Sequence, residues 1–563
     1  MLRKLNLHTI FFLSIIFLVG NSCRRGHSAD TSKLITTPEQ MDGVISENIK
    51  AVLLFAENNH GKINDSIQLK YDGLVNAFYE SNGYKNIWSK RGYWLPVSDS
   101  MFHFLFHASD VGLFKEDYHL KNLELIRLKL NTDSIAKSDA NLWTKVDLML
   151  TDAFMKAVKE LREGRLVEDS ISIVHQQKYI DSFFIVKLNN AVHLQEVNTT
   201  LFSLEPTHPE YIQLRSAVKS FVANMDSNEY ETIQYPYKDS LTFVKKIYQR
   251  LAPLDSISRK NLQPSLQDFS RELKRYQKEN QLIVDGKVGA EVVNALNLND
   301  RKKFLRIAIT LDRYKLLPAI PQSFIWVNIP GFYLRVWDND TVALWSKVVV
   351  GKPTTKTPAL TSLISDLVTY PKWTIPQSII KKDILPQLKI DPGYLQRKGF
   401  SLVDEKGETV NPYSVNWSKY SKGIPWNVVQ GSGDDNALGV IKFNFNNPYS
   451  VYLHDTNQRY LFQNANRALS HGCVRVEKWE GLSYFISRYD KMGMTSNQQI
   501  AYNEDSIKIW IAQKSRKRIL IKNKLRLFIG YYTCVGKNDE VVFYKDIYED
   551  DKRLAAIYFG KQL

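Results

Sequence analysis

The chain has 563 residues, of which 44% are hydrophobic and 24% are charged. This composition is ordinary for a globular protein, and the length predicts about three or four domains with cores of their own. The net charge of +16 suits an anionic neighbourhood. We find no long basic tract and no nucleic-acid-binding motif, so we expect no nucleic-acid partner.

The N-terminus is typical of an export signal. Two basic residues precede an apolar core from Ile10 to Val19, which is too short for a comfortable membrane span. Gly20-Asn21-Ser22-Cys23 resembles a lipoprotein processing site. We therefore predict a lipoprotein-type signal peptide over residues 1–22, lipidation of Cys23 and a tether over residues 23–34. An ordinary cleaved signal and a retained anchor are the alternatives, and both of them also take the protein out of the cytoplasm.

The chain has three cysteines, Cys23, Cys473 and Cys534. In an exported chain this odd number argues against a disulfide framework and for individual roles. Cys534 lies in the apolar run from Phe528 to Val535, so we expect it in a core. A bridge between Cys473 and Cys534 is the alternative, and it would remove both thiols.

Residues 35–250 have a mainly helical pattern and predict a helical scaffold domain. In the clearest segment, Lys145 to Arg165, Gly164 supplies a stop and five apolar residues mark one face: Val146, Leu150, Ala153, Ala157 and Leu161. The region from Phe78 to Trp94 is rich in aromatic residues. We expect these rings to be packing groups more than sugar-stacking platforms.

Residues 256–299 predict a small three-helix module. The turn Asp285–Gly289 precedes a short helix from Ala290 to Leu296. Before the turn, four apolar residues share a helical face: Leu266, Phe269, Leu273 and Tyr276. With Gln277 and Val284-Asp285-Gly286-Lys287-Val288-Gly289, the segment resembles peptidoglycan-binding modules. A helical spacer without a ligand is the alternative. Residues 300–321 follow as an amphipathic linking helix.

Residues 322–530 predict a mostly-β, sandwich-like domain. Its first strand-like runs are rich in β-branched and aromatic residues and are separated by turn residues: Phe324–Ile329, Tyr333–Trp337 and Val342–Val350. Residues from about 376 to 430 interrupt the pattern with helical and loop sequence. Asn436 to Gly439 then re-enters the sheet near the candidate site. With the helical domain and module, this predicts a multidomain α+β protein.

Two stretches of this domain offer nucleophilic chemistry. Ser470-His471-Gly472-Cys473-Val474-Arg475 supplies a thiol, and Tyr452-Leu453-His454-Asp455-Thr456 supplies an imidazole 19 residues upstream (473 − 454). A thiol attacks a carbonyl as the thiolate and needs a base or a positive field, and His454 is the candidate base. Residues 441–445 and 451–453 predict a hairpin on which Tyr452 and His454 project from one face.

Small residues make room beside the thiol. The N–H groups of Gly472 and Cys473 are candidate donors to an oxyanion. A buried apolar cysteine with a core histidine is one alternative, and a zinc site is another. No second Cys or His pair at ligand spacing lies nearby, so we predict no metal and no other cofactor.

These stretches resemble the L,D-transpeptidases with a YkuD-type catalytic domain, whose pattern is a His on a strand followed, after a loop, by Ser-His-Gly-Cys-x-Arg. The resemblance implies Cys473 as the acylated nucleophile, His454 as its base, and Tyr452 as a substrate or oxyanion contact. In that family a backbone carbonyl usually orients the base, so Asp455 is expected to contribute its main chain. Arg475 matches the family's arginine.

The remaining residues of the motif are assigned to substrate binding. Ser470 and His471 flank the catalytic Gly472, and His471 is a shaping residue or a second partner of the thiol. Tyr370-Pro371-Lys372-Trp373-Thr374-Ile375-Pro376 resembles the family's Pro-x-Trp-x-x-Pro element, so Trp373 is expected at the substrate entrance. Asn436 is the last residue that we assign to substrate binding.

Other segments extend the resemblance. Gly351-Lys352-Pro353 and Lys356-Thr357-Pro358 resemble the family's turn after the hairpin, and the interruption near 376–430 resembles the capping subdomain of its larger members. A helix from Glu477 to Tyr489 is expected to place its N-terminus behind Cys473, where its dipole would favour the thiolate. Residues 531–563 form a C-terminal segment that resembles the family's closing segment.

The resemblance implies a function in the bacterial cell envelope. We expect a periplasmic, membrane-anchored L,D-transpeptidase that acts on peptidoglycan stem peptides and glycan. It would release the terminal D-alanine of a tetrapeptide stem and form three-to-three crosslinks, and carbapenems would acylate Cys473. Water or a lipoprotein as acceptor would make it an L,D-carboxypeptidase or an anchoring enzyme. A non-catalytic peptidoglycan-binding lipoprotein is the alternative from another class.

Overall fold

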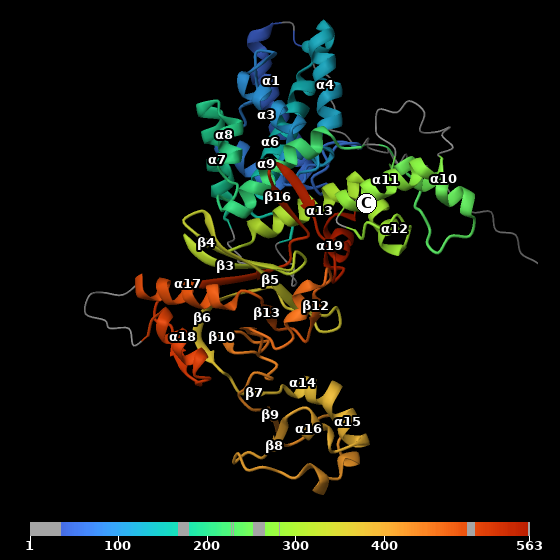
Figure 1. Ribbon diagram of the computed structural model, residues 1–563. Helices are drawn as coiled ribbons and strands as arrows, with labels where there is room; N and C mark the ends of the chain where they lie inside the picture. Colours follow the sequence, from blue (N-terminus) through green and yellow to red (C-terminus); the bar gives the residue numbers. More distant parts are fainter. Residues whose placement is uncertain are drawn as a thin grey trace, which may run out of the picture. The chain divides into compact units, whose positions relative to one another are not determined.

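The computed structural model describes residue 35 and residues 37–166, 179–226, 228, 230–251, 265–280, 282–492 and 502–560 (Figure 1). The predicted signal peptide, the tether and Cys23 lie outside these residues. The chain divides into two compact units, Met1–Ser98 with Lys121–Ala153, and Asp99–Leu120 with Phe154–Leu563. Within the described ranges, no helix is both long and apolar enough to cross a membrane.

The N-terminal part of the chain is mainly helical, as predicted. Its elements are α1 (Pro38–Glu57), α2 (Asp72–Ser81), β1 (Ser89–Lys90), β2 (Tyr93–Trp94), α3 (Pro96–Phe106), η1 (Ala108–Val111), η2 (Lys115–Tyr118), α4 (Leu120–Thr132), α5 (Ser134–Lys137), α6 (Ala140–Arg162), α7 (Asp181–Leu194), α8 (Val197–Phe202) and α9 (Pro209–Ala223). The five residues of the predicted apolar face of α6 are at most 1% exposed. The helix begins earlier than predicted because this face continues upstream through the buried Trp143.

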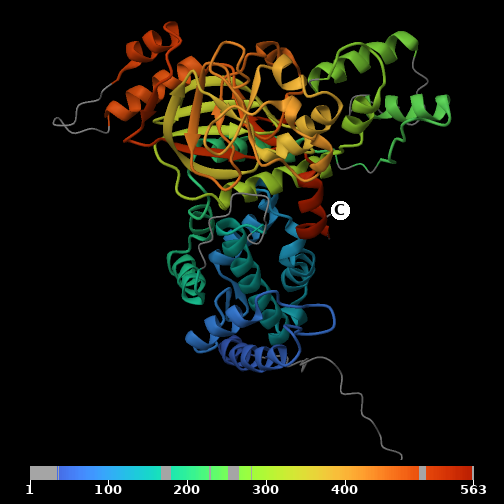
Figure 2. The same cartoon turned by 90° about the horizontal axis from the view of Figure 1, so that it is seen from below.

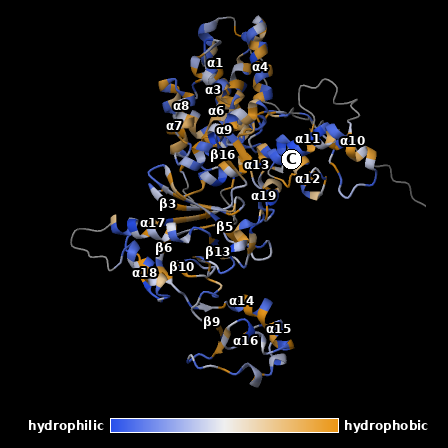
Figure 3. Cartoon of the chain, in the orientation of Figure 1, coloured by the Kyte–Doolittle hydropathy of each residue, from blue (hydrophilic) through white to orange (hydrophobic). Residues whose placement is uncertain are grey.

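Three helices share a small apolar cluster: α10 (Ser240–Leu251), α11 (Leu266–Glu279) and α12 (Ala290–Leu296). All three carry both hydrophilic and hydrophobic residues (Figure 3). The side chain of Gln277 fixes the turn after α11, since it accepts from the Gly286 N–H (2.8 Å) and donates to Asp285 (2.8 Å). Leu266, predicted on the shared face, is 89% exposed because it is the first residue of α11. α10 lies upstream of residue 256, where we predicted the group to begin.

The linking helix is observed as α13 (Asp300–Lys315) and packs on a β-sheet. Strand β3 (Ser323–Asn328) is buried at every position, because successive side chains point to opposite faces. Phe324 and Trp326 pack with residues of α13, whereas Ile325 and Val327 belong to the core of the β domain. The same alternation occurs in β4 (Tyr333–Asp338) and β15 (Arg526–Gly530).

The strands of this domain form one network that closes on itself (Figure 2). Its order is β10 (Ile441–Phe445), β11 (Leu453–His454), β13 (Val474–Val476), β5 (Thr341–Gly351), β4, β3, β15 and β6 (Leu360–Thr369), and β6 pairs back with β10. Two further strands join it, β12 (Ala468–Ser470) beside β5 and β14 (Arg518–Leu520) beside β6. The sequence predicts a sandwich-like domain, and the structure differs because β10 pairs on both of its sides.

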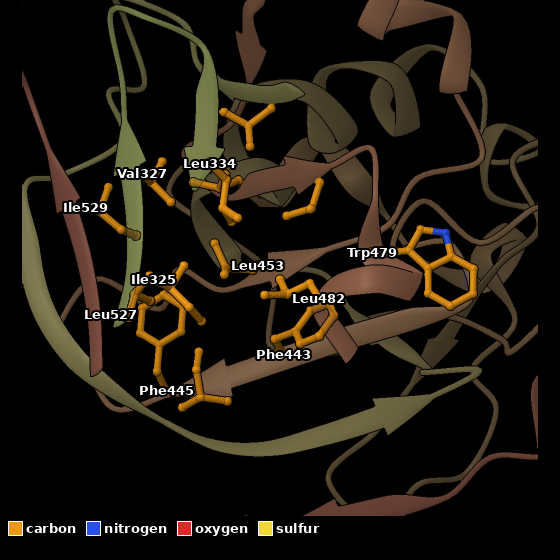
Figure 4. Close-up of a cluster of buried hydrophobic side chains, with 14 of the residues drawn as sticks. Ile325, Val327, Leu334, Phe443, Phe445, Leu453, Trp479, Leu482, Leu527 and Ile529 are labelled. Atoms are coloured by element: carbon orange, nitrogen blue, oxygen red, sulfur yellow. The ribbon is translucent and has the colours of Figure 1, made fainter. Parts of the chain in front are cut away.

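The interior of the closed network is an apolar core. Ten of its side chains, labelled in Figure 4, are at most 7% exposed: Ile325, Val327, Leu334, Phe443, Phe445, Leu453, Trp479, Leu482, Leu527 and Ile529. They come from strands and from α17 (Trp479–Met492), next to which lies α18 (Glu504–Ala512). Burying side chains of this size contributes roughly 1.5–3 kcal/mol each. This core therefore fixes the strands on which the candidate site is built.

Residues 373–430 form a subdomain inserted between β6 and β10, which we call the inserted subdomain. Its elements are β7 (Trp373–Thr374), α14 (Gln377–Ile379), η3 (Ile380–Ile384), α15 (Leu385–Ile390), α16 (Tyr394–Arg397), β8 (Phe400–Val403), η4 (Pro412–Ser414), η5 (Trp417–Lys419) and β9 (Asn427–Gln430). It has a core of its own around Trp417 and Leu388. Its two ends are paired, Trp373 with Gln430.

The C-terminal segment packs on the helices of its own unit. It contains β16 (Cys534–Lys537), β17 (Glu540–Phe543) and α19 (Asp550–Tyr558). The β16–β17 hairpin lies against α9. In a buried ion pair, Arg313 of α13 contacts Asp551 of α19 at 2.5 Å. The end of the described chain is therefore part of the fold around the β domain.

Candidate active site

Three neighbouring strands carry candidate side chains on one face of the sheet. In the register, Lys442 of β10 lies opposite His454 of β11, and His454 lies beside Arg475 of β13. Phe443 and Leu453 point into the core, so the alternation of a strand places these three polar side chains on the outer face. The predicted hairpin that carries His454 is confirmed.

Cys473 lies in a tight loop between β12 and β13. The hydroxyl of Ser470 donates to the Cys473 carbonyl (2.6 Å) and accepts from the Gly472 N–H (3.1 Å). Gly472 has φ of +122°, a conformation that residues with a side chain rarely adopt. The prediction that the Gly472 N–H holds an oxyanion does not fit this loop, because that N–H is bonded to Ser470. The Cys473 N–H donates no hydrogen bond within the described part of the chain and stays the candidate donor.

The turn after β5 holds this loop in place. Thr357 donates through Oγ1 to the Gly472 carbonyl (2.8 Å), and the Lys352 N–H donates to the Ser470 carbonyl (2.9 Å). A Cβ on Gly351 would lie 2.1 Å from a main-chain oxygen of the turn, so only glycine fits there. The turn singled out by resemblance therefore positions the loop that carries the thiol.

The C-terminal segment holds this turn after β5 in position. The Tyr548 hydroxyl donates to the Gly351 carbonyl (2.7 Å) and accepts from the Thr357 N–H (3.1 Å). Lys356 forms an ion pair with Asp550 (2.8 Å). The C-terminal segment therefore supports the Cys473 loop indirectly, through its contacts with the turn at residues 351–357.

The thiol of Cys473 lies beside Tyr452. Burial raises the pKa of the Cys473 thiol, whereas the main-chain N–H and hydroxyl of Tyr452 and the charges of Lys442 and Arg475 act in the opposite direction. Burial also raises the pKa of Tyr452, so its hydroxyl stays protonated. The resting thiol is therefore protonated, with groups around it that favour the thiolate.

The imidazole of His454 is 4% exposed and neutral. Burial is the main cause that lowers the pKa of His454 to about 3, and the charges of Arg475 and Lys442 act in the same direction. Its ring centroid lies 5.6 Å from that of Tyr452. Among the described residues, no hydrogen bond joins His454 to Cys473, and Nδ1 of His454 has no partner. The site therefore holds Cys473, Tyr452 and His454 together without a direct bond between thiol and imidazole.

Asp455 turns its carboxylate away from His454. The carboxylate accepts from the Val440 N–H (3.1 Å) and pairs with Arg459 (2.6 Å). The main-chain carbonyls of Asp455 and Leu438 face the imidazole instead, and they oppose the lowering of the His454 pKa. Main-chain carbonyls rather than the Asp455 carboxylate therefore act on the charge of the imidazole.

The inserted subdomain reaches the site at two points. Nε2 of His471 and the carboxylate of Asp383 in η3 are 2.9 Å apart. Trp373 of β7 lies near Tyr452, and its buried indole N–H makes no hydrogen bond among the described residues. The structure therefore places both His471 and Trp373 at the boundary between the subdomain and the thiol.

Two predicted substrate contacts have structural roles. Asn436 is 2% exposed, and its side-chain amide donates to the carbonyls of Pro371 (3.1 Å) and Gly431 (2.7 Å). Both N–H donors of its amide are used, so Asn436 links the two chain segments that flank the inserted subdomain. The prediction that Asn436 binds substrate does not fit this role. Arg475 donates to Gln458 (2.9 Å) and is half-buried, which makes it a source of positive charge beside the thiol.

The prediction that a helix N-terminus lies behind Cys473 is wrong. The helix is α17, which begins at Trp479 after the whole of strand β13. An extended strand of that length spans about 10 Å, and a helix dipole falls off within its first turn. The side chains of Lys442 and Arg475 provide the positive field instead.

Both described cysteines are free thiols, so the alternative of a Cys473–Cys534 bridge is excluded. Cys534 is fully buried, and burial raises its pKa to about 12. Within the described ranges, no cluster of three or more His, Cys, Asp or Glu side chains is arranged to hold a metal ion.

Comparison with known families agrees with this site. Residues 322–491 match the family model YkuD, described as the L,D-transpeptidase catalytic domain. Residues 73–218 match the model of a Scaffold domain. The chain therefore carries an L,D-transpeptidase catalytic domain of the YkuD family, joined to a helical scaffold domain.

A curated relative extends this comparison. The chain is 33% identical over 249 residues to a protein of Haemophilus influenzae (strain ATCC 51907 / DSM 11121 / KW20 / Rd) named "Putative L,D-transpeptidase". The aligned region covers 44% of this chain and 48% of that protein. The match thus spans about half the length of the relative.

Three residues of the site have no role predicted from the sequence, although the turn that contains Thr357 was singled out by resemblance. Lys442 lies on the same face as His454, Thr357 bonds to the Cys473 loop, and Tyr548 supports the turn. The alternation Ile441-Lys442-Phe443 was a usable signal for Lys442, since it predicts a polar residue on the face that carries His454. No sequence pattern links Thr357 or Tyr548 to the loop, because those contacts depend on tertiary packing.

Proposed function

We propose that this protein is an L,D-transpeptidase that acts on peptidoglycan tetrapeptide stems through a Cys473 acyl-enzyme and forms three-to-three crosslinks. One observation carries the proposal: Cys473, Tyr452 and His454 lie together in a domain of the YkuD family. The positive charges of Lys442 and Arg475 beside the thiol support a thiolate nucleophile.

In the proposed reaction, the Cys473 sulfur attacks the carbonyl carbon of the third stem residue. The C–S bond forms, His454 accepts the thiol proton, and the Cys473 N–H stabilises the negative carbonyl oxygen. The C–N bond to the terminal D-alanine then breaks, and the amine leaves with the proton from His454. The side-chain amine of a second stem attacks the thioester, forms the new amide and loses a proton to the base, and the Cys473 thiol is released.

The resting site requires a change before this reaction. Burial makes His454 a weak base and raises the thiol pKa, so proton transfer between them is unfavourable in the resting state. We infer that the inserted subdomain is a cap and that its displacement admits water and substrate. The contact of Asp383 with His471 supports this role, and so does the position of Trp373 near Tyr452.

The remaining proposals concern location and anchoring. We propose export to the periplasm and anchoring in a membrane through a lipid on Cys23, supported by the apolar N-terminal segment and the residues before Cys23. We also propose that helices α10–α12 bind peptidoglycan, supported by the turn motif around Gly286. Periplasmic peptidoglycan would be the shared substrate and partner.

The test is intact-mass spectrometry after incubation with a carbapenem and then with purified tetrapeptide muropeptides. The native protein should gain one carbapenem adduct and convert the muropeptides to three-to-three dimers, and Cys473→Ala should do neither. Cys534→Ala is the matched control: it removes the other described thiol, which is buried away from the site, and should keep both activities.

Each remaining outcome selects another function. Tripeptide without dimers would make the protein an L,D-carboxypeptidase, and transfer to a lipoprotein acceptor alone would make it an anchoring enzyme. Muropeptide binding without adduct or turnover would overturn the proposal in favour of a binding lipoprotein.

A further inference from the structure

Lys442 is an unusual residue in the site. It is half-buried on β10, and its Nζ lies 3.8 Å from the centroid of the Tyr452 ring. Within the described part of the chain, no ion pair includes Lys442. The carboxylate that acts on its charge is that of Asp366, and this group already accepts from Asn444 (2.7 Å) and pairs with Arg518 (3.3 Å). The ammonium is thus partly withdrawn from water without a carboxylate of its own.

Removing an ammonium from water is unfavourable unless another interaction compensates. The face of the Tyr452 ring supplies one such interaction, which is worth about 0.5–2 kcal/mol in proteins. Tyr452 is also a neighbour of the thiol, because Leu453 pairs with Val474 across β11 and β13 and the Val474 N–H donates to the Tyr452 carbonyl (3.1 Å). Lys442 lies over the Tyr452 ring, and Cys473 lies on the strand connection next to Tyr452, so both groups are neighbours of this tyrosine.

We propose that Lys442 is a positioning residue of the proposed reaction: its ammonium, held over the Tyr452 ring, stabilises negative charge on the Cys473 sulfur. The sheet fixes this arrangement, because Lys442 is paired directly with His454 across β10 and β11. An ammonium suits this task, since a compact point charge acts on sulfur without a directed hydrogen bond.

The other charged and titratable groups around the thiol are accounted for. Arg475 on β13 acts in the same direction as Lys442, and His454 on β11 is neutral. From the inserted subdomain, Asp383 is bonded to His471, so its charge is already paired. Lys442 is therefore a source of positive charge whose removal leaves the hydrogen bonds of the Cys473 loop intact.

The inference rests on the proposed function, but its test does not require turnover. The rate of Cys473 alkylation by iodoacetamide is followed by peptide mass mapping in the full protein between about pH 7 and 11.5, because burial raises the pKa of this thiol above its ordinary value. Lys442→Met should raise the pH midpoint by about one unit and slow alkylation near neutral pH about tenfold. Lys442→Arg keeps the charge and should stay close to the native midpoint.

The control is Lys508→Met. Lys508 lies over the Tyr484 ring (5.3 Å) on α18, so the variant removes a lysine–aromatic contact without touching the site. An unchanged midpoint in Lys442→Met, or an equal shift in Lys442→Arg, would overturn the proposal, because the residue would then act by packing. Lys442→Gln is the second neutral variant if Lys442→Met does not fold.

The two proposals fail in different ways. If the native protein forms no carbapenem adduct but the alkylation midpoint still depends on the charge at position 442, the transpeptidase function is wrong and the role of Lys442 stands. If acylation is observed and the midpoint is unchanged by Lys442→Met, only the role of Lys442 is wrong.

Discussion

The hydroxyl of Ser470 joins two main-chain groups around the nucleophile, the Gly472 N–H and the Cys473 carbonyl. It occupies the N–H that would otherwise face a substrate oxygen. Ser470 therefore fixes the loop and also determines which amide remains for an oxyanion.

Ser470→Ala should slow acylation of Cys473 by a carbapenem by up to about thirtyfold. The variant loses two hydrogen bonds of about 1 kcal/mol each, and 1.4 kcal/mol corresponds to a factor of ten in rate. The measurement is the rate of adduct formation by mass spectrometry. Ser362→Ala is the control, because the Ser362 hydroxyl donates to the Asn446 carbonyl (2.7 Å) on an exposed part of the domain. An acylation rate equal to that of the native protein would show that the loop holds its shape without this hydroxyl.

The sequence predicts the site residues whose side chains carry reactive chemistry. It misses the residues that act only through their packing or hydrogen bonds against those side chains. Cys473 and His454 are recognisable because a nucleophilic thiol needs a base. Lys442 and Thr357 are common residue types, and only tertiary packing brings them to the thiol. The prediction that Asn436 binds substrate is wrong for the same reason. Asn436 lies near the site, but its amide is bonded to the Pro371 and Gly431 carbonyls beside the inserted subdomain.

At the scale of elements, the inserted subdomain has a core separate from that of the closed network. Trp417 lies in this core, is 4% exposed and donates its indole N–H to the Pro412 carbonyl (2.8 Å). Local stability in a protein follows such cooperative units, so we expect this subdomain to open independently of the β domain.

Trp417→Ala should loosen the inserted subdomain alone. Removing a buried tryptophan costs about 3–5 kcal/mol. Hydrogen exchange should therefore accelerate at least tenfold in residues 375–430 and stay at native levels in β3 and β4. Tyr413→Ala is the matched control, because this tyrosine of the same subdomain is 63% exposed. Faster exchange in the β domain as well would mean that the two cores unfold together.

Strands and helices were predictable from their periodicity, but their closure and direction were not. The alternation in β3 indicates a strand buried on two faces, yet no local pattern shows that β10 pairs with both β6 and β11. The helix after Arg475 was recognised, but its distance from the thiol depends on strand β13, which is only three residues long. Short strands carry too little alternation to be seen in a sequence.

On the scale of the whole molecule, two buried histidines make stability depend on pH. Burial lowers the pKa of both His208 and His454 to about 3. In the unfolded chain each has a pKa near 6.5. Between about pH 3 and 6.5 the unfolded state therefore binds protons that the folded state does not, and stability falls as the pH is lowered through this window.

The effect of one histidine is measurable by substitution. Between pH 7 and 4, His208→Gln should lose about 3 kcal/mol less unfolding free energy than the native protein, because the unfolded variant has no imidazole to protonate there. Denaturant midpoints at both pH values give the comparison. A variant with the same loss as the native protein would mean that His208 is protonated in the folded state.

The paired ends of the inserted subdomain have a consequence for engineering. The chain enters the inserted subdomain at Trp373 and Thr374. It leaves the subdomain at Val429 and Gln430, which pair with those two residues. A single tight hairpin is enough to join two antiparallel neighbours. The subdomain is thus an exchangeable part: it can be excised, shortened or swapped for that of a relative, while the closed network beneath it keeps its register.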